Sequence, residues 1–325
     1  MNDASAAATG DVRRPTLVAV GEGLLEVGVR PDLPQDFLGR GFGGDVPNAA
    51  VMASRLGVDV RLLTRLGTDT AGRLLLDFWR ESGLDVDGIV TDADAPTGVY
   101  INETGPRHHR FDYYRSTSAA TLLGEGDVDA ESLNGADALY VSGISMSISD
   151  SSARAVEHAV ALARQRGVLV AFCANYRPAL RPDPGRLLAL ARTADIVIAS
   201  EDDIRGLLGS DERGAFREAL GPGPAEIVVT SGVTGATVDT GGEIHEVPAP
   251  RVRVKDTACA GDALAGTYMA MRLTGAAPHR ALSSGVLAGA LSCRRVGCAQ
   301  SYPSADELTR ARTAAGDGDR VFADE

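Results

Sequence analysis

The chain has 325 residues, and its 44 acidic against 32 basic side chains give a net charge of −12 at pH 7. Nucleic acids and anionic membranes are bound mainly through an excess of Lys and Arg, so this balance argues against both as partners. With 44% hydrophobic and 23% charged residues, the composition is that of an ordinary globular protein with a large core. No apolar run approaches the roughly 20 residues that span a bilayer.

Neither end of the chain predicts regular structure. Residues 1–15 lack the basic start and apolar centre of a signal peptide, and residues 315–325 are polar. We therefore expect a disordered tail at each end of a single domain at residues 16–314. The cysteines (Cys173, Cys259, Cys293 and Cys298) show no CxxC spacing, so a zinc site or a disulfide framework is not expected and a reducing cytoplasm fits best.

The first part of the chain alternates between strands and helices. Strands are predicted at Thr16–Gly21 and Val58–Leu66, and helices at Ala49–Leu56 and Thr70–Ser82. This order predicts a largely parallel sheet covered by helices.

Two glycine-containing segments in this region bear on ligand binding. Gly21-Glu22-Gly23 begins like a dinucleotide fingerprint, but Glu26 stands where the third glycine belongs and the following residues look extended, which disfavours nicotinamide binding. The pair Gly43-Gly44 lets a ligand approach the backbone closely, and Asn48 either caps the next helix or binds a hydroxyl group.

A predicted hairpin interrupts the alternation, with extended segments at Thr97–Glu103 and Arg110–Arg115. Tyr113 and Arg115 point to the same face of such a strand. Together with Tyr100 they suit a hydroxylated ligand that carries a carboxylate, although an ordinary solvated hairpin face fits the same residues.

The α/β alternation then resumes. Strands are predicted at Ala138–Gly143, Val168–Cys173, Asp195–Ala199 and Glu226–Thr230, and helices at Ser151–Arg166, Pro278–Arg295 and Ser304–Ala314. Arg177, Ser200 and the loop Ser231–Gly235 follow three of these strands, at the edge where open α/β sheets bind ligands. Such strand ends, beside an anion site, predict a nucleotide with Mg²⁺.

The most informative stretch is Lys255–Gly266. A strand is predicted at Arg251–Lys255 and a helix at Ala263–Leu273. Unpaired N–H groups at the positive end of the helix dipole form a site for phosphate. Asp262 places a carboxylate inside that site, which indicates a base for an attacking nucleophile; the alternative is an acid that only stabilises the helix N-terminus.

These motifs together resemble those of the ribokinase-like, or PfkB-type, carbohydrate kinases. The resemblance extends over about residues 18–308 and includes Gly43-Gly44-Asp45-x-x-Asn48, Pro96-Thr97-Gly98, Asn175-x-Arg177, Gly232–Gly235 and Asp256-Thr257-x-x-Ala260-Gly261-Asp262. It implies a three-layer α/β fold with a mostly parallel central sheet flanked by helices. It also implies a small β-rich lid at about residues 26–41 and 94–118, which commonly pairs two subunits.

Within this family, Tyr113-Tyr114-Arg115 and Asn175-Tyr176-Arg177 are most similar to segments of 2-keto-3-deoxygluconate kinases. The resemblance implies transfer of the ATP γ-phosphate to a terminal hydroxyl of a sugar acid, with Asp262 as base and the backbone of Ala258, Cys259, Ala260 and Gly261 as anion hole. It assigns the sugar to Gly43, Gly44, Asn48, Tyr100, Tyr113, Arg115 and Arg177, and ATP to Ser200, Thr230, Gly232, Gly235, Gly261 and Val286. Mg²⁺ is expected on the phosphates without a dedicated protein site, and a monovalent cation near Asp256 is left open.

Three positions depart from the family's pattern, of which Val286, where the family often has Asn near the adenine, is the smallest departure. Cys259 occupies a usual glycine position, and a positive φ there costs about 1 kcal/mol. Cys173 stands where the family has Asp. These departures leave open a degenerate homologue that binds sugar or nucleotide without catalysis, and both cysteines suggest redox sensitivity. A fructokinase- or ribokinase-type enzyme for neutral sugars is the closer alternative. The single lysine, Lys255, precedes Asp256, which excludes a Walker phosphate loop.

Overall fold

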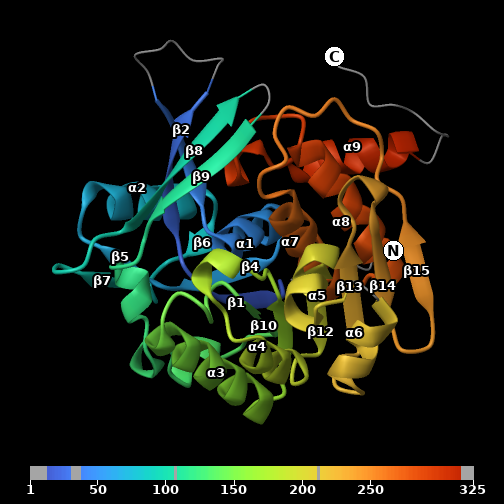
Figure 1. Cartoon of the computed structure of the whole chain (residues 1–325), viewed down its shortest axis with the longest axis horizontal. Coiled ribbons are helices and arrows are strands. Elements are labelled where there is room, and N and C mark those ends of the chain that lie inside the picture. The colour runs from blue at the N-terminus through green and yellow to red at the C-terminus, as the bar shows by residue number, and fades with distance from the viewer. Residues whose placement is uncertain (1–12, 31–37, 106–107, 211–212, 316–325) are drawn as a thin grey trace, which may run out of the picture.

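The computed structural model describes residues 13–30, 38–105, 108–210 and 213–315 (Figure 1). The predicted tails fall largely on residues 1–12 and 316–325, outside the described residues. Arg13, the first described residue, donates a hydrogen bond to the Asp137 carboxylate at 2.6 Å. Among the described helices, none combines the length and the apolar character that crossing a membrane requires.

A nine-stranded sheet, in the order β15-β14-β13-β12-β11-β10-β1-β4-β6, forms the centre of the molecule. Its strands are β1 (Thr16–Val20), β4 (Asp59–Leu63), β6 (Leu84–Asp85), β10 (Ala138–Ser142), β11 (Leu169–Cys173), β12 (Ile196–Ser200), β13 (Glu226–Thr230), β14 (Ala236–Asp239) and β15 (Ile244–Val247). All neighbours from β6 to β13 are parallel, and only the pairs β13–β14 and β14–β15 are antiparallel, so β14 alone runs against the other strands. The largely parallel sheet predicted from the sequence is therefore confirmed.

Helices cover both faces of this sheet. They are α1 (Asp45–Arg55), α2 (Thr70–Glu81), α3 (Asp150–Gln165), α4 (Pro184–Ala191), α5 (Glu201–Leu208), α6 (Arg213–Leu220), α7 (Ala260–Leu273), α8 (Pro278–Ser292) and α9 (Ala305–Ala315), with 3-10 turns at Ala119–Leu122, Glu125–Asp127, Glu131–Leu133, Pro178–Leu180, Gly232–Thr234 and Ala299–Ser301. One core cluster joins the sheet to α1, α7 and α8, and a second joins its other face to α3, α4 and α6. Strands buried between two helical layers need apolar residues on both faces, which accounts for runs such as Leu17–Val20.

A smaller sheet projects beyond the edge of the main body (Figure 1). It has the order β3-β2-β8-β9, with β2 at Leu24–Val29, β3 at Gly39–Gly43, β8 at Gly98–Gly105 and β9 at His108–Tyr114, and we call it the lid sheet. β8 and β9 are antiparallel, with Tyr100 opposite Tyr113, so the predicted hairpin is confirmed. A third, two-stranded sheet joins β5 (Arg65–Gly67) to β7 (Val90–Asp92) in parallel.

Two element boundaries differ from the predictions near the N-terminus. The predicted strand Val58–Leu66 divides at Thr64 into β4 and β5, which belong to different sheets. Helix α1 begins at Asp45, and Gly44 is its N-cap. Gly44 has a φ of 107°, a backbone conformation that glycine adopts readily and other residues rarely do. Asn48 therefore lies inside α1, and its predicted role as a helix cap is wrong.

The chain leading into the Lys255–Gly266 loop also differs from its prediction. Residues 251–255 form no ladder beyond an isolated bridge at Val252. Four of these five residues are exposed, so the segment does not alternate between core and solvent as a half-buried strand would. Helix α7 begins at Ala260, three residues before the predicted start.

Candidate active site

A cavity of about 540 Å³ lies between the lid sheet and the carboxyl ends of strands β11, β12 and β13. Its lining comes from most of the segments that the sequence motifs indicated. The predicted site residues in its wall are Gly44, Asn48, Tyr100, Tyr113, Arg115, Arg177, Ser200, Thr230, Ala258, Cys259, Ala260, Gly261 and Asp262. Parallel strands that end at one edge bring these distant segments together.

Four predicted residues do not line this cavity. Gly43 lies behind Tyr100, since a Cβ added to it would be 2.5 Å from the tyrosine ring. Gly232 and Gly235 belong to the turn after β13. Val286, on α8, lines a separate cavity of about 820 Å³ together with Val247.

Asp262 lies in the first turn of α7, and its Oδ2 accepts a hydrogen bond of 3.0 Å from Asn48 Nδ2. The residue is partly exposed, whereas its carboxyl group is enclosed by protein. Burial, followed by the negative charge of Asp45, raises the pKa of Asp262 to about 8, and the Asn48 hydrogen bond and Arg177 oppose this rise. A carboxylate whose pKa lies near neutral pH is suited to accept a proton from a hydroxyl group.

The N-terminus of α7 opens onto the same cavity. Its N-cap is Cys259, which has φ 59° and makes no side-chain capping hydrogen bond. The first-turn N–H groups of Gly261 and Asp262 have no acceptor within the helix. A Cβ added to Gly261 would meet no atom within 4 Å, so the space above this turn is open. These features fit a phosphate group, which backbone N–H groups and the helix dipole would both stabilise.

A buried ion pair in the cavity wall had no counterpart among the sequence predictions. Arg115 Nη2 lies 2.5 Å from Glu22 Oε2, and only 1% of the Glu22 side chain is exposed. Ser118 Oγ donates to Glu22 Oε1 at 3.3 Å. Burial raises the pKa of Glu22 to about 7, although Arg115 lowers it. Part of the positive charge of Arg115 is therefore already compensated by the protein itself.

A second missed carboxylate is Asp45, which follows Gly44. Its Oδ2 accepts a hydrogen bond of 2.8 Å from Asn175 Nδ2. The lining thus contains the carboxylates of Glu22, Asp45, Asp203 and Asp262 but only the guanidinium groups of Arg115 and Arg177. Asp45 belongs to the family motif Gly43-Gly44-Asp45-x-x-Asn48, but the sequence assigned the sugar to the glycines and Asn48 and no role to this acid.

The aromatic and cationic side chains of the predicted sugar site are arranged at the lid. The rings of Tyr100 and Tyr113 stack with their centroids 5.5 Å apart, and the Arg115 guanidinium lies 5.5 Å from the Tyr113 ring centroid. Arg177 keeps 52% of its side chain exposed, and its nearest carboxylate, that of Asp203, is 3.8 Å away. Arg177 is therefore the more accessible of the two arginines.

The predicted nucleotide side begins at the ends of β12 and β13. Ser200 caps α5, and its Oγ accepts a hydrogen bond of 3.0 Å from the backbone N–H of Asp203. In the turn after Thr230, Gly235 has φ 114° and passes so close to Val247 that an added Cβ would lie 2.0 Å from the Val247 carbonyl oxygen. Within the described part of the chain, no group of three or more His, Cys, Asp and Glu residues is arranged to hold a metal ion.

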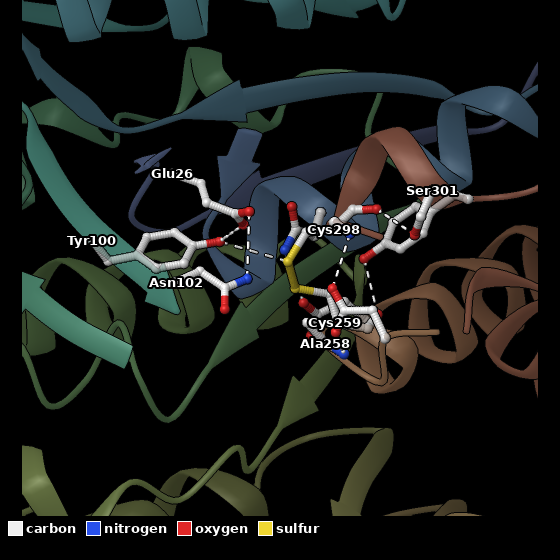
Figure 2. The surroundings of a disulfide bond; sticks show 12 residues. Glu26, Tyr100, Asn102, Ala258, Cys259, Cys298 and Ser301 are labelled. Carbon is white, nitrogen blue, oxygen red and sulfur yellow. Dashed lines mark hydrogen bonds between the residues drawn. A yellow bond between two sulfur atoms is a disulfide. The ribbon is translucent and has the colours of Figure 1, made fainter. Parts of the chain in front are cut away.

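A disulfide joins Cys259 to Cys298, in contrast to the sequence prediction (Figure 2). The prediction was wrong because the two cysteines are 39 residues apart and meet only when α7 and α8 pack against each other. Cys173 and Cys293 are free. Cys173 lines the cavity, and burial, followed by the charge of Asp203, raises the pKa of its thiol well above the usual value.

Comparison with known proteins agrees with this geometry. Residues 27–305 match the model of the pfkB family carbohydrate kinases. The chain is 35% identical to the 2-dehydro-3-deoxygluconokinase of Thermoproteus tenax over 315 residues, which cover 91% of this chain and 94% of that protein.

Two solved structures have the same fold. A fructokinase with bound ATP from Xylella fastidiosa superposes with a TM-score of 0.84 at 26% identity, covering 93% of this chain and 99% of that one. A putative ribokinase II from E. coli in complex with ATP and Mg²⁺ gives a TM-score of 0.83 at 25% identity, covering 94% and 100%. With a family match over most of its length and this ribokinase-like architecture, the chain belongs to the pfkB family of carbohydrate kinases and is a sugar kinase.

Proposed function

We propose that this kinase transfers the γ-phosphate of ATP to a terminal hydroxyl group of a sugar acid, 2-keto-3-deoxygluconate (2-dehydro-3-deoxygluconate). The observation that carries the proposal is one cavity that holds Asp262 at a helix N-terminus together with Arg115, Arg177 and the tyrosine pair of the lid sheet. The similarity to a 2-dehydro-3-deoxygluconokinase supports the choice of substrate.

Asp262 acts as the general base in this proposal. Its carboxylate, oriented by Asn48, takes the proton of the attacking hydroxyl group. Backbone N–H groups at residues 258–261 stabilise negative charge that develops on the transferred phosphoryl group. In the structure, the N–H of Ala258 donates to Asp256 and that of Ala260 to the Thr257 carbonyl oxygen, so the N–H of Gly261 is the more available donor.

MgATP would lie between the α7 N-terminus and the ends of β12 and β13, against Ser200, Thr230, Gly232, Gly235 and Gly261, with its base directed toward Val286. When bound, it supplies the transferable phosphoryl group, and Mg²⁺ neutralises phosphate charge. A monovalent cation near Asp256 stays a prediction. Both oxygen atoms of the Asp256 carboxylate already accept backbone hydrogen bonds, from Ala258 and Gly297, so this carboxylate by itself is no evidence for a cation.

The sugar site is formed in this proposal by Gly43, Gly44, Asn48, Tyr100, Tyr113, Arg115 and Arg177. The two arginines meet the carboxylate of the sugar acid. Guanidinium groups bind carboxylates through paired hydrogen bonds, which makes arginine well suited to this task.

A neutral sugar is the second candidate substrate, and the Glu22–Arg115 pair favours it. An arginine already paired with a carboxylate attracts a second carboxylate less strongly, and the lining has more acids than bases. A non-catalytic binding protein is the third candidate, against which the position of Asp262 argues.

A substrate panel in a coupled ADP-release assay tests these candidates. We expect turnover of 2-keto-3-deoxy sugar acids with kcat/KM at least tenfold above that of fructose or ribose. Equal turnover of neutral sugars without turnover of the acids refutes the sugar-acid assignment. Absence of ADP release with every sugar, together with retained ATP binding, supports a binding protein instead.

We further propose that residues 16–314 act as one kinase domain whose lid segments, about 26–41 and 94–118, close over the sugar, and that two chains pair through the lid. The exposed side chain of Tyr114, which does not line the cavity, supports the pairing. Because the reaction consumes ATP, we place it in the cytoplasm.

A further inference from the structure

The disulfide lies at the proposed phosphate site itself. Cys259 is the N-cap of α7, two residues before Gly261 and three before Asp262. Cys298, which immediately precedes the turn Ala299–Ser301, is almost completely buried and lines the same cavity. The bond therefore connects the proposed anion hole to a segment that follows α8.

Hydrogen bonds also connect the loop around Cys259 to the segment around Cys298. Asp256 accepts from the N–H of Ala258 with one oxygen and from the N–H of Gly297 with the other, at 2.9 and 3.0 Å. Tyr302 Oη donates to the Cys259 carbonyl oxygen at 3.0 Å. The segment at residues 297–302 thus holds the loop on both sides of Cys259.

The same segment contacts the base of the lid sheet. Tyr100 Oη, which donates to Glu26, lies 3.7 Å from Cys298 Sγ. Gln300 packs over the backbone of β3, since a Cβ added to Gly41 would lie 2.6 Å from Gln300 Nε2. Figure 2 shows Glu26, Tyr100 and Asn102 on one side of the Cys259–Cys298 disulfide and Ala258 on the other. The disulfide therefore stands between the proposed sugar lid and the proposed phosphate site.

The backbone of Cys259 explains why such a link is useful. Its φ of 59° is left-handed, which costs about 1 kcal/mol for a residue with a side chain and is almost free for glycine. The residue has neither a side-chain cap nor a strand ladder, and the hydrogen bonds that the structure describes hold only its carbonyl oxygen, which accepts from Tyr302 Oη and the Ala263 N–H. A covalent bond to a buried residue opposes relaxation of the loop into an ordinary right-handed or extended conformation.

We propose that Cys298 is a positioning residue for phosphate binding: its disulfide holds Cys259 in the left-handed conformation that aligns the first-turn N–H groups of α7. This inference rests on the proposed function for its catalytic consequence. Its structural part, the order of residues 257–262, does not depend on which sugar is phosphorylated.

The link is open to thiols through Cys259, because this residue is partly exposed whereas Cys298 is buried. A small thiolate attacks Cys259 Sγ, the Cys259–Cys298 bond breaks, and Cys298 leaves as a thiolate that takes up a proton. A second thiol then releases Cys259 from the mixed disulfide. The balanced result is two protein thiols and one small-molecule disulfide from two small-molecule thiols.

Four proteins test the proposal: the wild type, Cys298→Ala, the double variant Cys259→Gly with Cys298→Ala, and Cys293→Ser as a matched control at a free cysteine. The readouts are KM for ATP, kcat, and amide hydrogen exchange at residues 257–262. We expect Cys298→Ala to raise KM for ATP about tenfold, with a smaller change in kcat, and to accelerate exchange in the loop. In the double variant, the glycine at position 259 should return the KM for ATP and the rate of amide exchange most of the way to their wild-type values. The Cys293→Ser control should match the wild type.

If Cys298→Ala has the same KM for ATP and the same rate of amide exchange as the wild type, the proposal is overturned. A double variant as impaired as Cys298→Ala also overturns it, because Cys298 then contributes packing alone. If Cys298→Ala does not fold, the wild type is reduced under native conditions with a phosphine, and alkylation followed by mass spectrometry verifies the free thiols. Unchanged exchange in that reduced protein also overturns the proposal, whereas faster exchange supports it.

Failure of the proposed function has a different signature. If the wild type phosphorylates no sugar, amide exchange and the thermal shift produced by a non-hydrolysable ATP analogue still report on the loop. A change in these two readouts between the wild type and Cys298→Ala supports the role of the disulfide even then.

Discussion

Replacing Asp262 with Asn is the sharpest test of the proposed chemistry. The substitution keeps the size of the side chain, and the new amide oxygen can still accept the hydrogen bond from Asn48. ATP binding should be retained, because the proposed anion hole consists of backbone N–H groups. Turnover should fall by roughly 10²- to 10⁴-fold, the usual contribution of a general base, which corresponds to about 2.7–5.5 kcal/mol of barrier.

The pKa of Asp262 adds a pH signature to this loss. With a pKa of about 8, only roughly a tenth of the free wild-type enzyme has the base deprotonated at pH 7. The wild-type kcat/KM should therefore rise about tenfold between pH 7 and pH 9, while the variant should lack this rise and keep only the change that comes from Glu22, whose pKa is about 7. In the wild type, stability should also fall as pH rises from about 4 to 8, because the folded state holds a proton that the unfolded chain releases.

The assay is coupled ADP release across this pH range, with urea unfolding of each protein as a check on the fold. Asp150→Asn is the matched control, since Asp150 also lies in the first turn of a helix but is exposed and outside the cavity. It should change helix stability by at most about 1 kcal/mol and leave turnover unaltered. If Asp262→Asn keeps wild-type turnover, the acid serves only the helix N-terminus and the proposed mechanism is refuted.

Three further substitutions probe the cavity wall. Gly44→Ala should destabilise the fold by about 2–3 kcal/mol in urea unfolding, because Gly44 has a φ of 107° and the new Cβ would lie 2.1 Å from the Glu22 carbonyl oxygen. Gly57→Ala is the control: Gly57 has a φ of 89° but open space around it, so the substitution should cost only about 1 kcal/mol. Glu22→Gln should free Arg115 and raise the ratio of kcat/KM for sugar acids to that for neutral sugars up to about tenfold, or ~1.4 kcal/mol; an unchanged ratio means that the ion pair does not set specificity. Arg177→Met should raise KM for sugar acids with kcat little changed. If KM for sugar acids and KM for neutral sugars both keep their wild-type values in the variant, Arg177 does not bind the carboxylate.

Much of the fold was predictable because it depends on local patterns. Continuous apolar runs such as Leu17–Val20 indicated strands buried on both faces, and glycine stops after Leu56 and Ser82 indicated helix ends. The two strands at one end of the main sheet, β14 and β15, were not predicted. β14 and β15 are short, and the exposed residues of β15 give no two-residue hydrophobic period.

The site was predictable where a residue acts through its own backbone or its place in a motif. The α7 N-terminus, with Asp262 in its first turn, follows from a loop and a helix that are adjacent in sequence. Charge compensation is different, since the partner of Arg115 is Glu22, in a segment interpreted only as a failed dinucleotide motif. Nothing local to either residue indicates the other.

The sequence by itself determined the class of this protein, a parallel α/β sugar kinase, and located an acid in the first turn of a helix at the proposed anion site and a hairpin that carries tyrosine and arginine. Only the tertiary structure decided that Asn48 donates to Asp262 across 214 residues, that Glu22 pairs with Arg115, and that Cys259 is bonded to Cys298. The physical reason is that element type follows from short-range periodicity and capping. Side-chain partners instead depend on where separate strands and helices end in space, and this is set only when the layers pack.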